Sequence, residues 1–165
     1  MITSASKPEL FRRVLGNFAT GVTVITVERS SGVIHGMTAS SFTSLSLDPL
    51  LVLVCVDHEA LLLSYLKMQR RFGVSILKAE QRELSDHFAR GEQGPEADAR
   101  LGIRYQWTVT GIPLLENSLA RVGCNVVAEH PGGDHTIFVA EVESMEYSEG
   151  EPLIHHRGRY RQLQP

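Results

Sequence analysis

Residues 22–41 read VTVITVERSSGVIHGMTASS, and this stretch decides the fold. Its first part, Val22 to Val27, is dominated by β-branched side chains, which lose rotamer freedom in a helix and fit a pleated strand. The turn residues Ser30-Ser31-Gly32 follow, and a second strand-like run extends from Val33 to Ser41. Two such runs joined by a glycine-containing turn predict an antiparallel β-hairpin.

The segments on either side of this hairpin predict further short elements. On the N-terminal side, Ser6-Lys7-Pro8-Glu9 is a capping-box pattern, and apolar residues recur at helical spacing from Leu10 to Phe18. On the C-terminal side, Asp48-Pro49 interrupts any strand, and the apolar run at 50–56 is typical of a strand buried on both faces. The patterns that follow predict a helix over 60–68, a strand over 72–77 and a helix over 80–90 that ends at Gly91.

The second half of the chain adds more strand signals and one predicted loop. Residues 91–100 are polar, charged and interrupted by Gly94-Pro95, so we expect a mobile surface loop there. Two strand-like runs, 120–128 and 136–142, are joined by a reverse connection over 130–135, and a short strand is expected in the C-terminal tail. Five or six strands with short helices and no regular βαβ alternation predict one α+β domain, residues 1–165, built as a mainly antiparallel barrel.

Composition and charge restrict the classes of function. The 165 residues include 16 Lys and Arg against 19 Asp and Glu, a net charge of −3, so no broad basic field favours nucleic acid as a partner. The longest apolar run, 50–56, is far below the roughly 20 residues that span a bilayer, and the first residues lack a signal-peptide core, so we expect neither a membrane protein nor an exported one. Cys55 and Cys124 each lie in an apolar segment, which favours two buried thiols in a reducing cytoplasm.

Several common catalytic motifs are absent from the sequence. No two glycines have the GxG spacing, so the GxGxxG dinucleotide fingerprint is missing, and neither GxxxxGK[ST] nor GxSxG occurs. The 7 histidines include two close sets, His130 with His135 and the adjacent His155-His156, and neither has the spacing of a metal site. We therefore expect no Rossmann unit, no P-loop, no α/β-hydrolase site and no bound metal.

Hydroxyl-bearing residues concentrate between Gly36 and Ser46, which reads GMTASSFTSLS. Small side chains let other groups approach the backbone N–H groups closely, and Ser and Thr hydroxyls both donate and accept hydrogen bonds. The segment therefore suits the polar edge of a flat ring, or a phosphate. The alternative interpretation is a Ser/Thr-rich edge strand with a turn, and the residues alone leave both open.

Six segments of the chain occur in a characteristic order. They read FATGVTVIT at 18–26, the 36–47 segment with Asp48-Pro49, LVLVCVD at 51–57, FGVSIL at 72–77 with Gln81 and Phe88-Ala89, GDHTIF at 133–138, and Pro152-Leu153 with Gly158-Arg159-Tyr160. In this order they resemble the short-chain flavin reductase family, the NAD(P)H:flavin oxidoreductases that supply two-component monooxygenases. The resemblance runs from about Phe11 to Leu163.

The resemblance implies a split β-barrel with short flanking helices that binds FMN or FAD, and a homodimer with the flavin at or near the subunit contact. It implies hydride transfer from NADH or NADPH to flavin N5, followed by release of the reduced flavin to a separate monooxygenase. The absent GxGxxG agrees with this, because these enzymes stack the nicotinamide on the flavin. Donor and acceptor need mainly to be held face to face, so no acid–base pair is required.

The resemblance also assigns candidate site residues by position. Hydrogen bonds to the isoalloxazine edge would come from Thr38, Ala39, Ser40 and Ser41, with Phe42 and Ser44 shaping the adjacent turn. The ribityl and phosphate side would be lined by Cys55, Val56 and Asp57, the nicotinamide would face His135, and the site would be closed by Arg159 and Tyr160. Other interpretations stay open: Cys55 and Phe42 as core residues, Asp57 as a cap of the next helix, His135 as a turn histidine without a ligand, and 157–161 as a solvated tail.

The chain departs from the family after the strand at 50–56. Family members often carry Ser or Thr there as phosphate ligands, whereas this chain reads HEALLL at 58–63. Lys78, Arg82 or His58 could hold the flavin phosphate instead, and we expect weak flavin binding. Two other functions stay open: a flavin-binding electron carrier without reductase turnover, and an FMN-dependent oxidase that keeps its flavin tightly.

Overall fold

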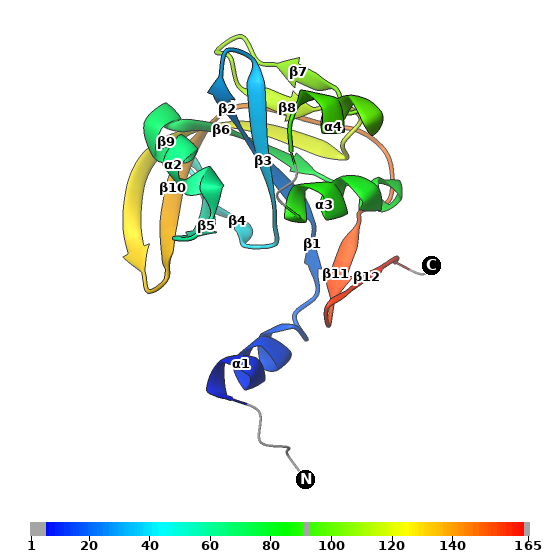
Figure 1. Cartoon of the computed structure of the whole chain (residues 1–165). Helices are drawn as coiled ribbons and strands as arrows, with labels where there is room; N and C mark the ends of the chain where they lie inside the picture. The colour runs from blue at the N-terminus through cyan, green and yellow to red at the C-terminus, as the bar shows by residue number, and fades with distance from the viewer. Residues whose placement is uncertain (1–5, 91–92, 164–165) are drawn as a thin grey trace.

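A seven-stranded antiparallel sheet forms the body of the molecule in the computed structural model, which describes residues 6–90 and 93–163 (Figure 1). In spatial order the strands are β3 (Val33–Ala39), β2 (Thr23–Ser30), β6 (Arg71–Ile76), β9 (Ala120–Gly132), β10 (His135–Tyr147), β5 (Leu50–Asp57) and β4 (Phe42–Leu47). The hairpin predicted at 22–41 is confirmed as the β2–β3 pair. The reverse connection predicted at 130–135 is present but shorter, because β9 continues to Gly132 and β10 already begins at His135.

The sheet closes because its two edge strands are consecutive in the chain. Strands β3 and β4 lie at opposite edges of the sheet, yet only Ser40 and Ser41 separate them. Two residues span less than about 10 Å even when extended, so the two edges are drawn together. The predicted antiparallel barrel is confirmed, and its seam lies at this connection.

The apolar core fills the inside of the barrel. Alternation along β5 directs Val52, Val54 and Val56 into the core, while the intervening residues are only partly buried. The prediction of a strand buried on both faces is therefore wrong, because an antiparallel sheet packs one face on the core and the outward residues of β5 happen to be apolar as well. The same alternation leaves Cys55 partly exposed, so only Cys124 is a buried thiol.

The short helices lie against the barrel. The predicted helices at 60–68 and 80–90 are confirmed as α2 (Leu61–Gln69) and as η1 (Ala79–Gln81) followed by α3 (Arg82–Ala89). Helix α3 packs Phe88 directly on β3 at Gly36, where an added Cβ would lie 2.4 Å from the phenyl ring. Only glycine allows this close approach of helix and strand.

The segment predicted as a loop contains a short helix. Residues 91–92 lie outside the described residues, but Pro95–Arg100 form α4, which has proline in its first turn. Asp98 on α4 accepts a hydrogen bond from the Tyr105 hydroxyl at 2.9 Å and is hydrogen bonded to His87 of α3 at 3.1 Å. The pKa of Tyr105 is raised, mainly because the side chain is buried. These tertiary contacts explain why a polar, charged sequence is helical here.

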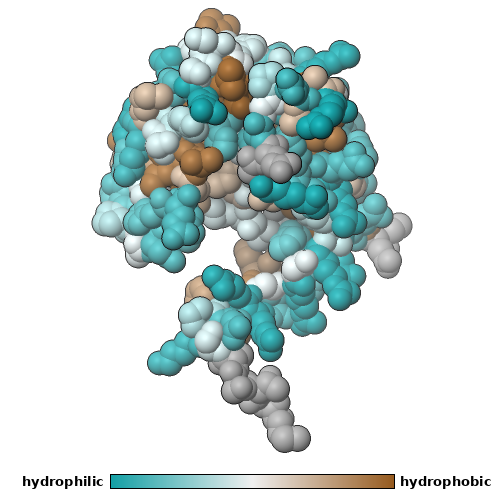
Figure 2. All heavy atoms as spheres, in the orientation of Figure 1, coloured by the Kyte–Doolittle hydropathy of each residue, from teal (hydrophilic) through white to brown (hydrophobic). Residues whose placement is uncertain are grey.

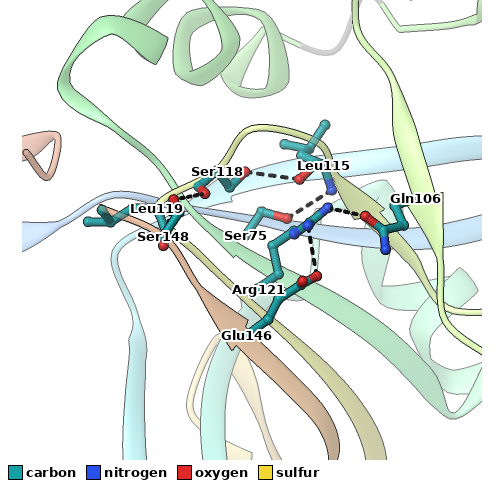
Figure 3. A network of polar contacts seen from close by, with 8 residues as sticks. All are labelled: Ser75, Gln106, Leu115, Ser118, Leu119, Arg121, Glu146 and Ser148. Atoms are coloured by element: carbon teal, nitrogen blue, oxygen red, sulfur yellow. Dashed lines mark hydrogen bonds and ion pairs between the residues drawn. The ribbon is translucent and has the colours of Figure 1, made fainter. Parts of the chain in front are cut away.

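A polar network anchors the β7–β8 hairpin to the sheet (Figure 3). The hairpin pairs β7 (Tyr105–Trp107) with β8 (Pro113–Leu115), and its Leu115 N–H donates to the buried Ser75 hydroxyl of β6 at 3.0 Å. Arg121 of β9 donates to Gln106 at 2.8 Å and forms an ion pair with Glu146 at 2.8 Å. The hairpin is thereby held over β6 and β9.

The N-terminal helix stands apart from the barrel as an arm (Figure 1). The capping box is confirmed, and α1 (Lys7–Leu15) follows it without burying any residue. The chain then forms β1 (Thr20–Gly21), which pairs with β11 (Ile154–His156), and β11 pairs with β12 (Arg159–Arg161). This small three-stranded sheet connects the arm to the barrel.

The strand count is higher than predicted. Five or six strands were expected and twelve are found in the described residues, because β1, β7, β8, β11 and β12 have only two or three residues each and β4 is the edge strand that was the alternative interpretation of the Ser/Thr-rich segment. Such short pairings carry too little periodic pattern to be recognised. None of the helices in the described residues is long and apolar enough to cross a membrane.

Candidate active site at the seam of the barrel

The β3–β4 connection is exposed and tied to the neighbouring strand. The Ser41 hydroxyl donates to the Cys55 carbonyl at 2.8 Å, and the Cys55 N–H donates to the Ser41 carbonyl at 3.3 Å. Ser40 and Ser44 are exposed beside them. The seam therefore presents a short run of backbone and hydroxyl groups whose position is held by β5.

A second group of polar side chains lies where β3, α3 and β12 meet. Thr38 donates to the Ser85 carbonyl at 2.7 Å, and the Ser85 hydroxyl shares a 2.8 Å hydrogen bond with the Tyr160 hydroxyl. Tyr160 also donates to Asp86 at 3.2 Å, and the Arg82 guanidinium lies 5.1 Å from the centre of the Tyr160 ring. Thr38 and Tyr160 are predicted site residues that lie far apart in the sequence, and α3 connects them.

The third part of the site is the rim formed by the last residues of β5 and the first residue of β10. Register pairs Asp57 with His135, so the Cys55 to Asp57 segment runs beside the His135 strand. The His135 Nδ1 lies 2.7 Å from an Asp134 carboxylate oxygen, and this hydrogen bond is the main cause that lowers the pKa of Asp134. His135 is 39% exposed. Its ring is therefore oriented through one nitrogen while the other is available at the rim.

Not every predicted site residue presents its side chain to this region. The side chains of Ala39 and Val56 are buried in the core, so only their backbone groups can contact a ligand. Phe42 packs against the same core, as its non-functional interpretation predicted. Arg159 is exposed and, by strand alternation, lies on the face of β12 opposite to Tyr160.

The interpretations of Asp57 and of the phosphate candidates also become clearer. Asp57 accepts a hydrogen bond from the Glu59 N–H at 2.8 Å, so it holds the turn before α2, although Ala60 is the residue at the helix cap. His58 donates its N–H to the Asp134 carbonyl, which places it at the His135 rim. Arg82 is the candidate cation that lies beside Tyr160.

Sequence reasoning missed Ser85 and Asp86. Ser85 is fully buried, and its hydroxyl and carbonyl connect Tyr160 to Thr38. One signal was available: Ser85 lies on the same helical face as Phe88, and a hydroxyl buried on that face requires a hydrogen-bond partner. The sequence pattern does not show which distant residue is that partner.

The arrangement is suited to holding a planar polar ligand rather than to acid–base chemistry. Exposed backbone and hydroxyl groups at Ser40 and Ser41 are available to a ring edge, and the His135 imidazole at the rim can donate a hydrogen bond. Among the residues that the structure describes, no group of three or more His, Cys, Asp or Glu could hold a metal ion.

Comparisons with known proteins agree with this description. A family profile described as flavin reductase like domain matches residues 15–164. An NADH-dependent flavin reductase of Rhodococcus sp is 41% identical over 159 residues, covering 95% of this chain and 87% of the relative. The reductase subunit HsaB of a flavin-dependent monooxygenase from Mycobacterium tuberculosis is 36% identical over 161 residues, covering 96% and 83%. The solved structure of the NADH:FAD oxidoreductase SgcE6 from Streptomyces globisporus has a TM-score of 0.87 at 36% identity, covering 100% and 98%.

The antiparallel barrel and its structural neighbours define an oxidoreductase of the split-barrel class. The chain belongs to the flavin reductase family, as the order of its motifs predicted, and it is an oxidoreductase that reduces flavin.

Proposed function

We propose that this protein transfers a hydride from NADH to free FMN or FAD at the seam of the barrel and releases the reduced flavin to a separate monooxygenase. The observation that carries the proposal is the exposed β3–β4 connection, where Ser40 and Ser41 offer polar groups next to the His135 rim. The names of the relatives support NADH as the donor and a monooxygenase as the recipient.

The proposed roles follow from position. Backbone and hydroxyl groups from Thr38 to Ser41 hold the edge of the isoalloxazine, and Tyr160 on β12 closes the site from the side of α3. His135, oriented by Asp134, donates a hydrogen bond to the nicotinamide carboxamide. The hydride passes from the nicotinamide to flavin N5, which oxidises NADH to NAD⁺ and reduces the flavin by two electrons.

Weak retention of flavin belongs to the same proposal. A flavin phosphate near the end of β5 meets the exposed Glu59 carboxylate at the start of the 58–63 segment instead of a hydroxyl or a cation. A carboxylate repels a phosphate, so the flavin is a substrate that leaves after reduction. The reaction belongs in the cytoplasm, where unpaired thiols such as Cys55 and Cys124 stay reduced.

The proposal includes a homodimer. The apolar side of α1 is exposed, with Phe11 at 66% together with Leu10, Val14 and Leu15, and Phe18 just after the helix is 76% exposed. An amphipathic helix whose apolar side is exposed is suited to cover a second copy, and a twofold pair buries both arms at once. The exposed Leu47 on β4, 87% exposed, provides a further apolar surface at an edge strand.

A two-compartment dialysis experiment tests the release of reduced flavin. Protein is kept in one anaerobic compartment, and FMN and NADH are free to diffuse through both. We expect the yellow of flavin to disappear in the protein-free compartment much faster than in a cell without protein. Bleaching confined to a stoichiometric amount of protein-bound flavin would instead support the electron carrier or the oxidase.

A further inference from the structure

A cationic cavity lies outside the seam, between the arm and the tip of the β11–β12 hairpin. Its volume is about 490 Å³, and it is lined by Arg12, Arg13, Gly16, Asn17, Arg157 and Gly158. Three of these six residues are arginines and none is acidic, although the whole chain has a net charge of −3. Figure 1 shows the end of α1 beside the turn between β11 and β12.

The cavity is a built junction between two elements. The Arg157 N–H donates to the Gly16 carbonyl at 2.9 Å, and the Arg157 Nε donates to the Asn17 side-chain oxygen at 2.7 Å. The Asn17 amide group in turn donates to the carbonyl of Arg13 at 2.8 Å. These bonds hold the Arg157 guanidinium against the end of α1 and leave its two terminal nitrogens for a ligand.

The charges of this cavity are uncompensated within the described part of the chain. Arg70, Arg82 and Arg121 each form an ion pair with a carboxylate. No described carboxylate lies within ion-pair distance of Arg12, Arg13 or Arg157. Three arginines line one cavity and no described carboxylate offsets their charge, so the cavity favours an anion.

The hairpin tip has an arginine where turn chemistry favours another residue. Arg157 and Gly158 are the two central residues of the turn, with φ of 52° and 73°. Positive φ at both positions is usual for Asn-Gly and uncommon for arginine. Turn chemistry therefore does not explain the arginine, whose side chain instead bonds Asn17 and adds a charge to the cavity.

The cavity lies within reach of the candidate active site. Arg157 and Tyr160 belong to the same hairpin, and three residues of extended chain cover about 10 Å. Tyr160 is hydrogen bonded to Ser85 at the site. A dinucleotide whose ring system lies at the seam could therefore extend its second half towards the arginines.

We propose that this cavity binds the ADP half of a dinucleotide substrate, FAD or NADH, an inference that rests on the proposed function. Guanidinium groups pair with pyrophosphate oxygens through two parallel hydrogen bonds and also stack on an adenine ring. FMN ends at the phosphate next to the ribityl chain and lacks the second phosphate, the ribose and the adenine, so it can make only part of these contacts. The cavity would then distinguish FAD from FMN, or strengthen the binding of NADH.

Calorimetric titration of the purified protein with ADP tests the cavity without requiring any turnover. We expect saturable binding of ADP that weakens about tenfold in Arg13→Gln and in Arg157→Asn, since a hydrogen bond to a charged group is typically worth about that factor. Arg157→Asn introduces the residue that this turn prefers, so the fold should be retained. Arg29→Gln, which removes an exposed arginine at the far end of β2, is the matched control and should bind ADP as the wild type does.

Kinetics identify the source of the ADP half. If it belongs to FAD, the two variants raise KM for FAD more than KM for FMN; if it belongs to NADH, they raise KM for NADH with either flavin. Absence of ADP binding in the wild type, or equal losses in Arg29→Gln, would overturn the inference. If the protein binds ADP as described but oxidises no NADH with any flavin, the proposed function is refuted and the assignment of the cavity as an ADP site is retained.

Discussion

His135 is the residue whose loss should affect the reaction most while leaving the fold intact. It lies on an exposed rim, and its ring is oriented by Asp134 at 2.7 Å. Loss of one hydrogen bond to the nicotinamide costs about 1 to 3 kcal/mol, so His135→Ala should lower kcat/KM for NADH by about 5- to 150-fold. Flavin affinity and Tm should change little.

His130→Ala is the matched control, because His130 is an exposed histidine on the partner strand of the same hairpin. It should behave as the wild type. Unchanged kinetics in His135→Ala would remove His135 from the site, and a large loss of flavin affinity would mean that it contacts the flavin instead.

The two cysteines should differ in reactivity. Burial is the main cause that raises the pKa of Cys124 from 9.0 to about 12, while Cys55 is partly exposed on β5. Thiol titration with a chromogenic disulfide near pH 8 should therefore modify Cys55 in the native protein and Cys124 only after unfolding. Rapid modification of both thiols would contradict the placement of Cys124 in the core.

The raised pKa of Cys124 also has a consequence for stability. A group whose pKa is raised on folding contributes fully below its unfolded pKa, and that contribution is lost as pH rises through the folded value. The free energy of unfolding should therefore decrease between about pH 9 and pH 12, the two values for Cys124. The decrease should be smaller in Cys124→Ala, measured by denaturant titration across this range.

Among the elements, the contact between β3 and α3 controls the candidate site. An alanine at Gly36 would place its Cβ 2.4 Å from the Phe88 ring, so α3 must shift. Overpacking of this kind costs about 1 to 3 kcal/mol. We expect Gly36→Ala to lower Tm and to weaken flavin binding, because α3 carries Ser85, which connects Thr38 to Tyr160.

Gly21→Ala provides the comparison, since nothing lies within 4 Å of a Cβ at that position in β1. A second change, Phe88→Leu, should restore part of the lost flavin affinity in the Gly36→Ala background by removing the clashing ring. If Gly36→Ala binds flavin as tightly as Gly21→Ala does, the β3–α3 contact does not support the site.

The elements differ in how far the sequence predicts them. Strand β6 was predicted within one residue at each end, whereas β2, β-branched in its first part, begins within one residue of the prediction and ends three residues beyond it. Helix α4 was missed because its stability comes from Asp98 bonding to His87 and Tyr105, which are contacts between segments. Short strands such as β1 and β11 are defined by their pairing, β1 with β11 and β11 with β12, rather than by a pattern of their own.

The residues of the candidate site also differ in how far the sequence predicts them. Thr38 and Ser41 were predicted from a motif that is contiguous in the chain, and in the structure Thr38 bonds α3 whereas Ser41 bonds β5 at the seam. Ser85 and the Arg12 to Arg157 cavity depend on the meeting of segments far apart in sequence. Local sequence patterns carry no information about contacts between distant segments. The packing of α3 and of the arm determines these contacts.

For the molecule as a whole, the exposed arm predicts a homodimer. Each chain weighs 18.3 kDa, so light scattering at micromolar concentration should return about twice that mass. Phe11→Glu, which places a charge on the apolar side of α1, should reduce the mass towards that of one chain. Val109→Glu, at a fully exposed loop residue, should leave the assembly unchanged. A wild-type mass of a single chain would contradict the dimer.

The loss of NADH absorbance at 340 nm, with and without added flavin and with no organic substrate, tests the central claim most directly. The account predicts negligible oxidation without flavin and continuous, multiple-turnover oxidation once FMN or FAD is added, because the exposed seam takes flavin as a substrate. Equal, negligible rates in both conditions would contradict it.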